Sequence, residues 1–140
     1  MTKHFPAHGR YKIYCDDRLL VSEIQGPWNI EFIREWSTAS IPFCEAMKQG
    51  GPWIAVAIIA GSMLATPEAM DALRKVITNS REIYGCIGHA LVAAPDVAGR
   101  GLVEFAFERS YGDISTTAFL DDYASAKAWA QQLLTATPRE

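Results

Sequence analysis

A chain of 140 residues is long enough for one domain with a real hydrophobic core, and its composition, 49% hydrophobic and 21% charged, is that of an ordinary globular protein. The net charge of −3 comes without any block of like charges, which argues against nucleic acid as a partner, since phosphate binding needs a concentrated basic surface. Residues 1–10 hold no apolar run of the kind found in signal peptides, and the longest apolar stretch, residues 53–60, is too short to span a bilayer, so we expect a cytoplasmic protein.

The first elements are predicted to be a β-hairpin followed by a long helix. Residues 10–15 and 19–24 are typical of strands, and the acidic pair between them favours a turn. Asn29 is a suitable N-cap for a helix that runs to about Lys48. Pro42 lies inside this helix on its polar side, so we expect one continuous helix with a bend.

Two buried strands with a helix between them are expected next. Residues 53–60 and 86–93 are continuous apolar runs, as in strands that are buried on both faces of a parallel sheet. Between these runs, Thr66-Pro67-Glu68 offers an N-cap, a first-turn proline and a first-turn acid in the correct order. This pattern predicts that the second helix begins there.

The last part of the chain is predicted to form a helix, a short strand and a final helix. We expect Asp96 to cap a helix that ends at Tyr111. Residues 115–119 are rich in β-branched side chains and favour a strand. Asp121 or Asp122 is expected to cap the final helix.

The predicted order, β-β-α-β-α-β-α-β-α, indicates an α/β fold in a single domain over residues 1–140, with its core over about residues 9–134. Strands separated by helices imply right-handed crossovers, and therefore a single layer of mostly parallel five-stranded sheet with four helices. The first strand is expected to be an antiparallel edge strand. The order of the strands within the sheet is left open.

This element order, with a second strand that ends in Ile24-Gln25-Gly26-Pro27-Trp28 and a buried strand opened by Gly51-Pro52-Trp53, resembles a known group of proteins. It is similar to the SpoIIAA-like proteins of the STAS superfamily, the anti-sigma-factor antagonists and their uncharacterised bacterial relatives. The resemblance covers residues 9–134, and residues 59–73 contribute to it. CRAL–TRIO lipid-binding domains share the same architecture.

The resemblance implies a partner-binding loop at the start of the second helix. In anti-sigma-factor antagonists a serine there is phosphorylated to switch partner binding, and its position falls on Pro67, which has no hydroxyl. We therefore expect no phosphorylation switch at this position. Glu68 could mimic the phosphorylated state or simply suit the helix dipole. The candidate contact loop for a protein partner consists of Ser62, Thr66, Pro67 and Glu68.

The sequence lacks the patterns of the common catalytic and metal sites. No Gly-x-Ser-x-Gly elbow surrounds Ser62, and Cys15, Cys44 and Cys86 lie too far apart for a zinc knuckle or a disulfide framework. His89 stands alone in an apolar run, where a hydrogen-bonded structural histidine is more typical than a base or a pH sensor. We therefore expect no enzyme, no cofactor and no metal.

Aromatic residues define the candidate ligand site. The helix predicted over residues 96–111 has an apolar arc wider than the stripe of about 100° that a core-facing helix needs. Gly99 and Gly101 are expected to loosen its first turn, which would make this helix the mobile wall of an apolar site opposite the first helix, to which Trp28 and Trp36 are assigned. The candidate ligand-binding residues are Trp28, Phe32, Trp36, Leu102, Phe105 and Phe107.

Two functions stay open on this basis. The first is a non-catalytic module that binds an apolar small molecule or lipid, with peripheral membrane contact as an extension of the same surface. The alternative is a protein-interaction regulator akin to anti-sigma-factor antagonists, without their phosphorylatable serine. The oligomeric state is not predicted, and a dimer is compatible with the sequence.

Overall fold

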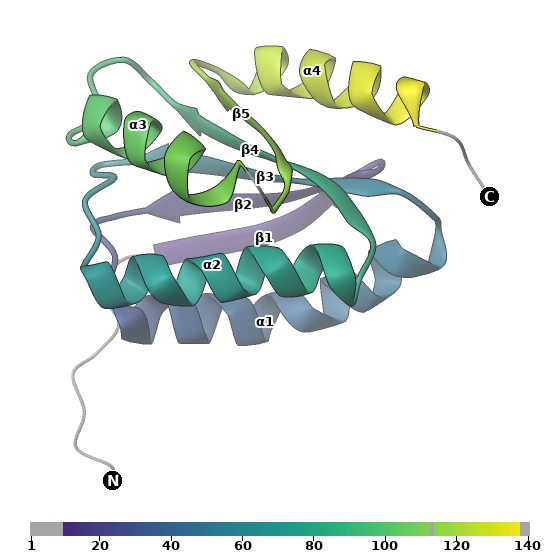
Figure 1. Cartoon of the computed structure of the whole chain (residues 1–140), viewed down its shortest axis with the longest axis horizontal. Coiled ribbons are helices and arrows are strands. Elements are labelled where there is room, and N and C mark those ends of the chain that lie inside the picture. The colour runs from purple at the N-terminus through teal and green to yellow at the C-terminus, as the bar shows by residue number, and fades with distance from the viewer. Residues whose placement is uncertain (1–9, 113, 138–140) are drawn as a thin grey trace, which may run out of the picture.

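A computed structural model describes residues 10–112 and 114–137, with the side chains of residues 105, 106 and 108–111 left out of the description (Figure 1). Over this range the elements follow the predicted order. They are β1 (Arg10–Asp16), β2 (Leu19–Gln25), α1 (Ile30–Gln49), β3 (Trp53–Ala60), α2 (Pro67–Glu82), β4 (Cys86–Ala93), α3 (Arg100–Tyr111), β5 (Thr116–Leu120) and α4 (Tyr123–Ala136).

The five described strands form one mixed sheet in the order β1-β2-β3-β4-β5. Strand β1 pairs with β2 in the antiparallel direction, and the other neighbours pair in parallel, which confirms the predicted antiparallel first strand. Figure 1 shows α1 and α2 on one side of the sheet and α4 on the other. Buried residues of α3, among them Phe107, belong to the same core cluster as those of α1 and α2.

The sheet therefore separates two cores. On the side of α1, α2 and α3 the core includes the fully buried Phe32 and Trp53. On the other side, Ala126 and Ala130 of α4 pack against the alternate residues of the strands, such as Val56. No helix in the described ranges is long and apolar enough to cross a membrane.

Three predicted helix caps are confirmed. The side chain of Asn29 accepts the backbone N–H of Phe32, that of Thr66 accepts Ala69 N–H, and that of Asp122 accepts Ser125 N–H. Each bond satisfies one of the N–H groups that a helix start leaves without an internal partner. Helix α1 also runs as one helix through the exposed Pro42, as predicted.

The predicted start of α3 is wrong. Asp96 caps no helix, because α3 begins at Arg100 and residues 94–99 form a loop. Gly99 ends this loop with φ of +81°, a left-handed conformation that an α-helix cannot contain. The assignment of Trp28 to the first helix is also wrong, because Trp28 precedes the cap residue Asn29. Strand β5 begins at Thr116, one residue later than predicted.

Candidate functional site

The loops at the carboxyl ends of β2, β3 and β4 are joined to one another by backbone pairing. Trp28 forms a parallel bridge with Ala65, and Ser62 forms one with Ala98. Met63 N–H donates to the Ala98 carbonyl over 2.8 Å. The loop predicted to contact a partner is therefore held between the loop that carries Trp28 and the loop that precedes α3.

The close approach of the first two loops depends on Gly26. A Cβ atom at this position would lie 2.0 Å from the carbonyl oxygen of Ser62 and 2.9 Å from Nε1 of Trp28. Since real Cβ atoms do not come so close to backbone, only glycine allows the two loops to touch. Trp28, two residues after Gly26, is 4% exposed.

A cavity of about 80 Å³ lies between the middle of the sheet and the helices α1 and α2. Its wall is formed by residues of β2, β3, β4, α1 and α2, with Phe107 from α3 and Trp28 from the loop after β2. The described residues that line it are mostly apolar, and none of them is Asp, Glu, Lys or Arg. A small uncharged molecule fits such a wall better than an ion does.

The structure brings three of the predicted ligand residues together around this cavity: Trp28, Trp36 and Phe107. Phe32 is fully buried outside the cavity wall and contacts the ring of Tyr11 edge-on, with 5.8 Å between the ring centroids. Leu102 lies apart from them, because its side chain is 69% exposed. The side chain of Phe105 lies outside the described residues.

Three buried serines in the cavity wall were not among the predicted site residues. Ser22 of β2 accepts the indole N–H of Trp36 over 2.9 Å. Ser40 of α1 donates its hydroxyl to the carbonyl of Ser37, and Ser80 of α2 donates to that of Ile77, each over 2.7 Å. A serine on an otherwise apolar face of a helix or strand is the sequence signal that could have identified them.

His89 and Cys44 are the titratable residues among the described residues of the wall. Because the Ser80 hydroxyl donates to Ile77, its oxygen accepts from Nε2–H of His89, and Nδ1 then accepts the hydroxyl of Ser115. Burial without a charged partner lowers the pKa of His89 to about 4, so the ring is neutral at physiological pH.

The hydrogen-bonded cluster around His89 consists of uncharged side chains. Ser115 is 6% exposed, and His89 has no carboxylate partner among the described residues that could orient it as a base. The Cys86 thiol lies 3.7 Å from Nε2 of His89 but donates to the carbonyl of Gly88. Burial raises the pKa of Cys86 to about 12, which keeps it a thiol.

The predicted partner-contact loop lies at the surface. Pro67 and Glu68 are exposed at the start of α2, where Thr66 uses its hydroxyl oxygen as the N-cap. Ser62 is half-buried, and its hydroxyl oxygen accepts the backbone N–H of Leu64. The side chain of Leu64 is itself 50% exposed.

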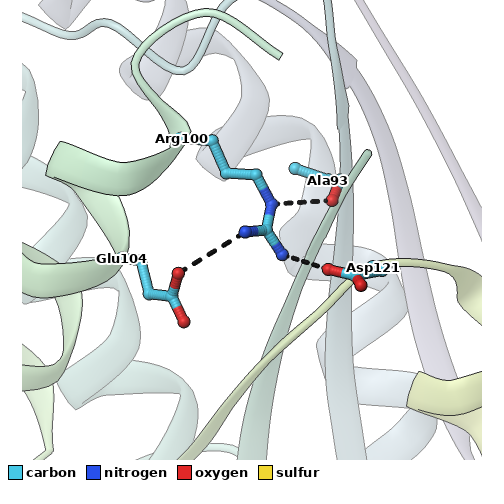
Figure 2. A network of polar contacts seen from close by, with 4 residues as sticks. All are labelled: Ala93, Arg100, Glu104 and Asp121. Atoms are coloured by element: carbon cyan, nitrogen blue, oxygen red, sulfur yellow. Dashed lines mark hydrogen bonds and ion pairs between the residues drawn. The ribbon is translucent and has the colours of Figure 1, made fainter. Parts of the chain in front are cut away.

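The first turn of α3 is fixed by Arg100 (Figure 2). The guanidinium of Arg100 donates to the Ala93 carbonyl at the end of β4 over 3.0 Å. It also forms ion pairs with Asp121, after β5, and with Glu104 one turn along α3, the latter over 3.5 Å. The helix start that was expected to be loose is thus tied to two neighbouring strands, and the guanidinium is occupied by groups of the protein itself.

Within the described parts of the chain, no group of three or more His, Cys, Asp or Glu side chains is arranged to hold a metal ion. Comparison of the chain with protein-family models, with curated proteins and with solved structures gave no match.

Proposed function

We propose that this protein is a non-catalytic binding module that holds a small, mainly apolar molecule in the cavity between its sheet and helices α1 and α2. The observation that carries the proposal is the cavity itself, about 80 Å³ in the centre of the larger core. Native interiors are close-packed, and voids larger than a water molecule are few. A cavity of this size lined by aromatic and aliphatic side chains is consistent with a role in binding.

The size of the cavity favours a small molecule over a lipid chain. An engineered apolar cavity of about 150 Å³ admits benzene. The present cavity has about half that volume, so its ligand has only a few non-hydrogen atoms unless the wall opens. Opening at α3 would require release of the bonds that Arg100 makes to Ala93 and Asp121.

Membership of the SpoIIAA-like branch of the STAS superfamily is part of the same proposal. It is supported by the described element order and by the mixed sheet whose first strand is antiparallel. A cytoplasmic location is proposed as well, supported by three free cysteines, of which Cys15 is exposed.

Xenon is a direct probe of the cavity, because apolar cavities bind it. Xenon should shift the NMR signals of cavity-lining residues saturably in the wild-type protein. The substitution Ala57→Leu fills the cavity and should abolish these shifts, whereas Ala46→Leu, on the exposed side of α1, should leave them unchanged. Failure of the wild-type protein to bind xenon, together with no co-purified small molecule in native mass spectrometry, would refute the proposal.

A second function, protein interaction at the carboxyl ends of the strands, is favoured by two exposed leucines. Leu64 packs against Gly99, where an added Cβ would lie 2.8 Å from its Cδ2, and Leu102 follows Gly99 by three residues in the first turn of α3. Leu64 is 50% exposed and Leu102 is 69% exposed, and Leu64 precedes Pro67 and Glu68 in the same loop. Such exposed apolar groups are typical of interaction surfaces.

Paired substitutions separate this function from non-specific adhesion. If a specific partner binds this surface, Leu102→Ser should abolish its capture from cell extract. Ile83→Ser is the control, because Ile83 is similar in size to leucine, is 50% exposed and lies at the other end of α2, and this variant should still capture the partner. Equal loss in both variants, or no partner at all, would count against a contact surface at this end. Retention by anionic vesicles that depends on Leu102 would instead identify peripheral membrane contact.

A further inference from the structure

We infer that the ligand of the cavity is an uncharged molecule that carries a hydrogen-bond acceptor oxygen, such as a small ketone or ester, and that Ser22 and Trp28 are the residues that recognise it. This inference rests on the proposed function, because it names the chemical class that the same cavity takes. It follows from which hydrogen-bond donors in the wall are already used and which are not.

Ser22 has a hydroxyl proton to offer. Its Oγ accepts the indole N–H of Trp36, which is the only hydrogen-bond donor of that side chain and is therefore already satisfied. The hydroxyl of Ser22 donates to none of the described residues, although the side chain is only 5% exposed and lines the cavity. Ser40 and Ser80 line the same cavity but differ from Ser22, because each donates its hydroxyl to a helix carbonyl.

Trp28 supplies the second free donor. Its Nε1 is fully buried and has no hydrogen-bond partner among the described residues, while the ring lines the cavity. By contrast, the indole of the half-buried Trp36 donates to Ser22, and that of the buried Trp53 donates to the carbonyl of Tyr84. A buried N–H without an acceptor is destabilising, and native proteins rarely leave one unless something else satisfies it.

Charge excludes the other common acceptor groups. No Lys or Arg stands among the described lining residues, and the low pKa of His89 keeps its ring neutral. A carboxylate or phosphate would therefore enter the cavity without a counter-charge, which is strongly unfavourable. The wall thus offers a free donor at each of two places, the Ser22 hydroxyl in the middle of β2 and the Trp28 indole beside Gly26 after its end. With an apolar wall and no cation, these donors select a neutral molecule with an acceptor oxygen.

Two isosteric probes test this inference. Butanone and 2-methylbut-1-ene have the same arrangement of non-hydrogen atoms, and the second replaces the ketone oxygen by CH₂. Each is titrated into the ¹⁵N-labelled full-length protein, with butyrate at pH 7 as the charged probe, and the indole N–H signals of Trp28, Trp36, Trp53 and Trp129 are followed. We expect butanone to move the Trp28 signal saturably downfield and butyrate to leave it in place.

Variants assign the effect to the two donors. Trp28→Phe should weaken butanone binding about two- to tenfold, the usual worth of one neutral hydrogen bond, and leave binding of the alkene unchanged. Ser22→Ala removes the hydroxyl but also frees the indole N–H of Trp36, so butanone should move the Trp36 signal in this variant and not in the wild-type protein. Ser37→Ala is the matched control, because the Ser37 hydroxyl donates to the carbonyl of Arg34 and Ser37 is not among the described lining residues, and it should leave both dissociation constants within about twofold. If a variant fails to fold, the shift of the Trp28 indole signal in the wild-type protein on addition of butanone still tests whether Trp28 binds the ketone oxygen.

The outcomes separate this inference from the function on which it rests. Equal effects of the variants on both probes, or no shift of Trp28 by butanone, would overturn the inference and leave the apolar binding function standing. Binding of neither probe, with long-lived water in contact with the Trp28 N–H, would mean that the cavity holds ordered water only and would overturn both. Binding of butyrate as tightly as butanone would overturn the selection for a neutral oxygen.

Discussion

Nδ1 of His89 lies 2.7 Å from the hydroxyl oxygen of Ser115, and this bond places a neutral imidazole between β4 and the start of β5. All described side chains that bond to the ring, those of Ser80, Cys86 and Ser115, are uncharged. Protonation of His89 would therefore put an unpaired charge into the core and reverse the bond to Ser115, because Nδ1 would become a donor and the Ser115 hydroxyl would turn to the carbonyl of Thr116.

The first prediction follows from this geometry. Burial lowers the pKa of His89 from 6.5 to about 4, so in this window the unfolded chain binds more protons than the folded one. Stability is therefore fully present above pH 6.5 and falls by about 3 kcal/mol as the pH drops to 4. Urea unfolding between pH 4 and 7 measures the slope, and His89→Gln should flatten it. Equal slopes in both proteins would contradict the assignment to His89.

The second prediction concerns two glycines with opposite surroundings. Gly26→Ala should destabilise the protein by about 1–3 kcal/mol, because the new methyl group would meet the Ser62 backbone. Gly101→Ala should stabilise it by about 0.5–1 kcal/mol, because a Cβ there meets nothing within 4 Å and alanine favours a helix. Thermal unfolding of both variants provides the test, and the same sign for both would be inconsistent with the loop contact.

The third prediction is that Arg100 holds the start of α3. Arg100→Met should lower stability by about 1–2 kcal/mol and speed hydrogen exchange in the first turn of α3, since three acceptors lose their donor. Arg100→Lys should not restore the wild-type value, because an ammonium group lacks the planar fork that reaches all three. Arg34→Met, at an exposed site on α1, is the control and should change little.

The fourth prediction concerns the cap of α2. Thr66→Ala should cost about 0.5–2 kcal/mol through loss of the bond from Ala69 N–H, and Thr66→Ser should retain most of the stability. Denaturant unfolding compares the three proteins. Stoichiometric phosphate on Thr66 in protein from its native cell would show instead that this hydroxyl is available for regulation.

Features fixed by neighbours in the chain could be predicted from the sequence. The caps at Asn29 and Thr66 depend on one side chain and a backbone N–H three residues away, so a local pattern contains all the information. The buried strands β3 and β4 are continuous apolar runs and were placed with their observed bounds. The alternation of strands and helices then determined the parallel sheet.

Features that depend on contacts between residues far apart in the chain could not be predicted from the sequence. The start of α3 depends on the bond from Met63 to Ala98, 35 residues apart, which holds residues 94–99 as a loop. No local pattern around Asp96 contains that contact, and the residue looked like a good N-cap. Similarly, Ser22 and Trp36 form their hydrogen bond only because β2 packs against α1. This bond and the cavity beside it could therefore not be predicted from the sequence.

The order of strands in the sheet has a consequence for the way the chain is made. Each described strand pairs with the strand before it, so a growing chain can add β3, β4 and β5 to a completed edge as each emerges from the ribosome. The face of the sheet that includes Leu19, Val21 and Ile54 is buried last during synthesis. It packs against α4, which is the last described element of the chain. A nascent chain that stalls before α4 would present this apolar face to solvent, and would be a natural client for a holding chaperone.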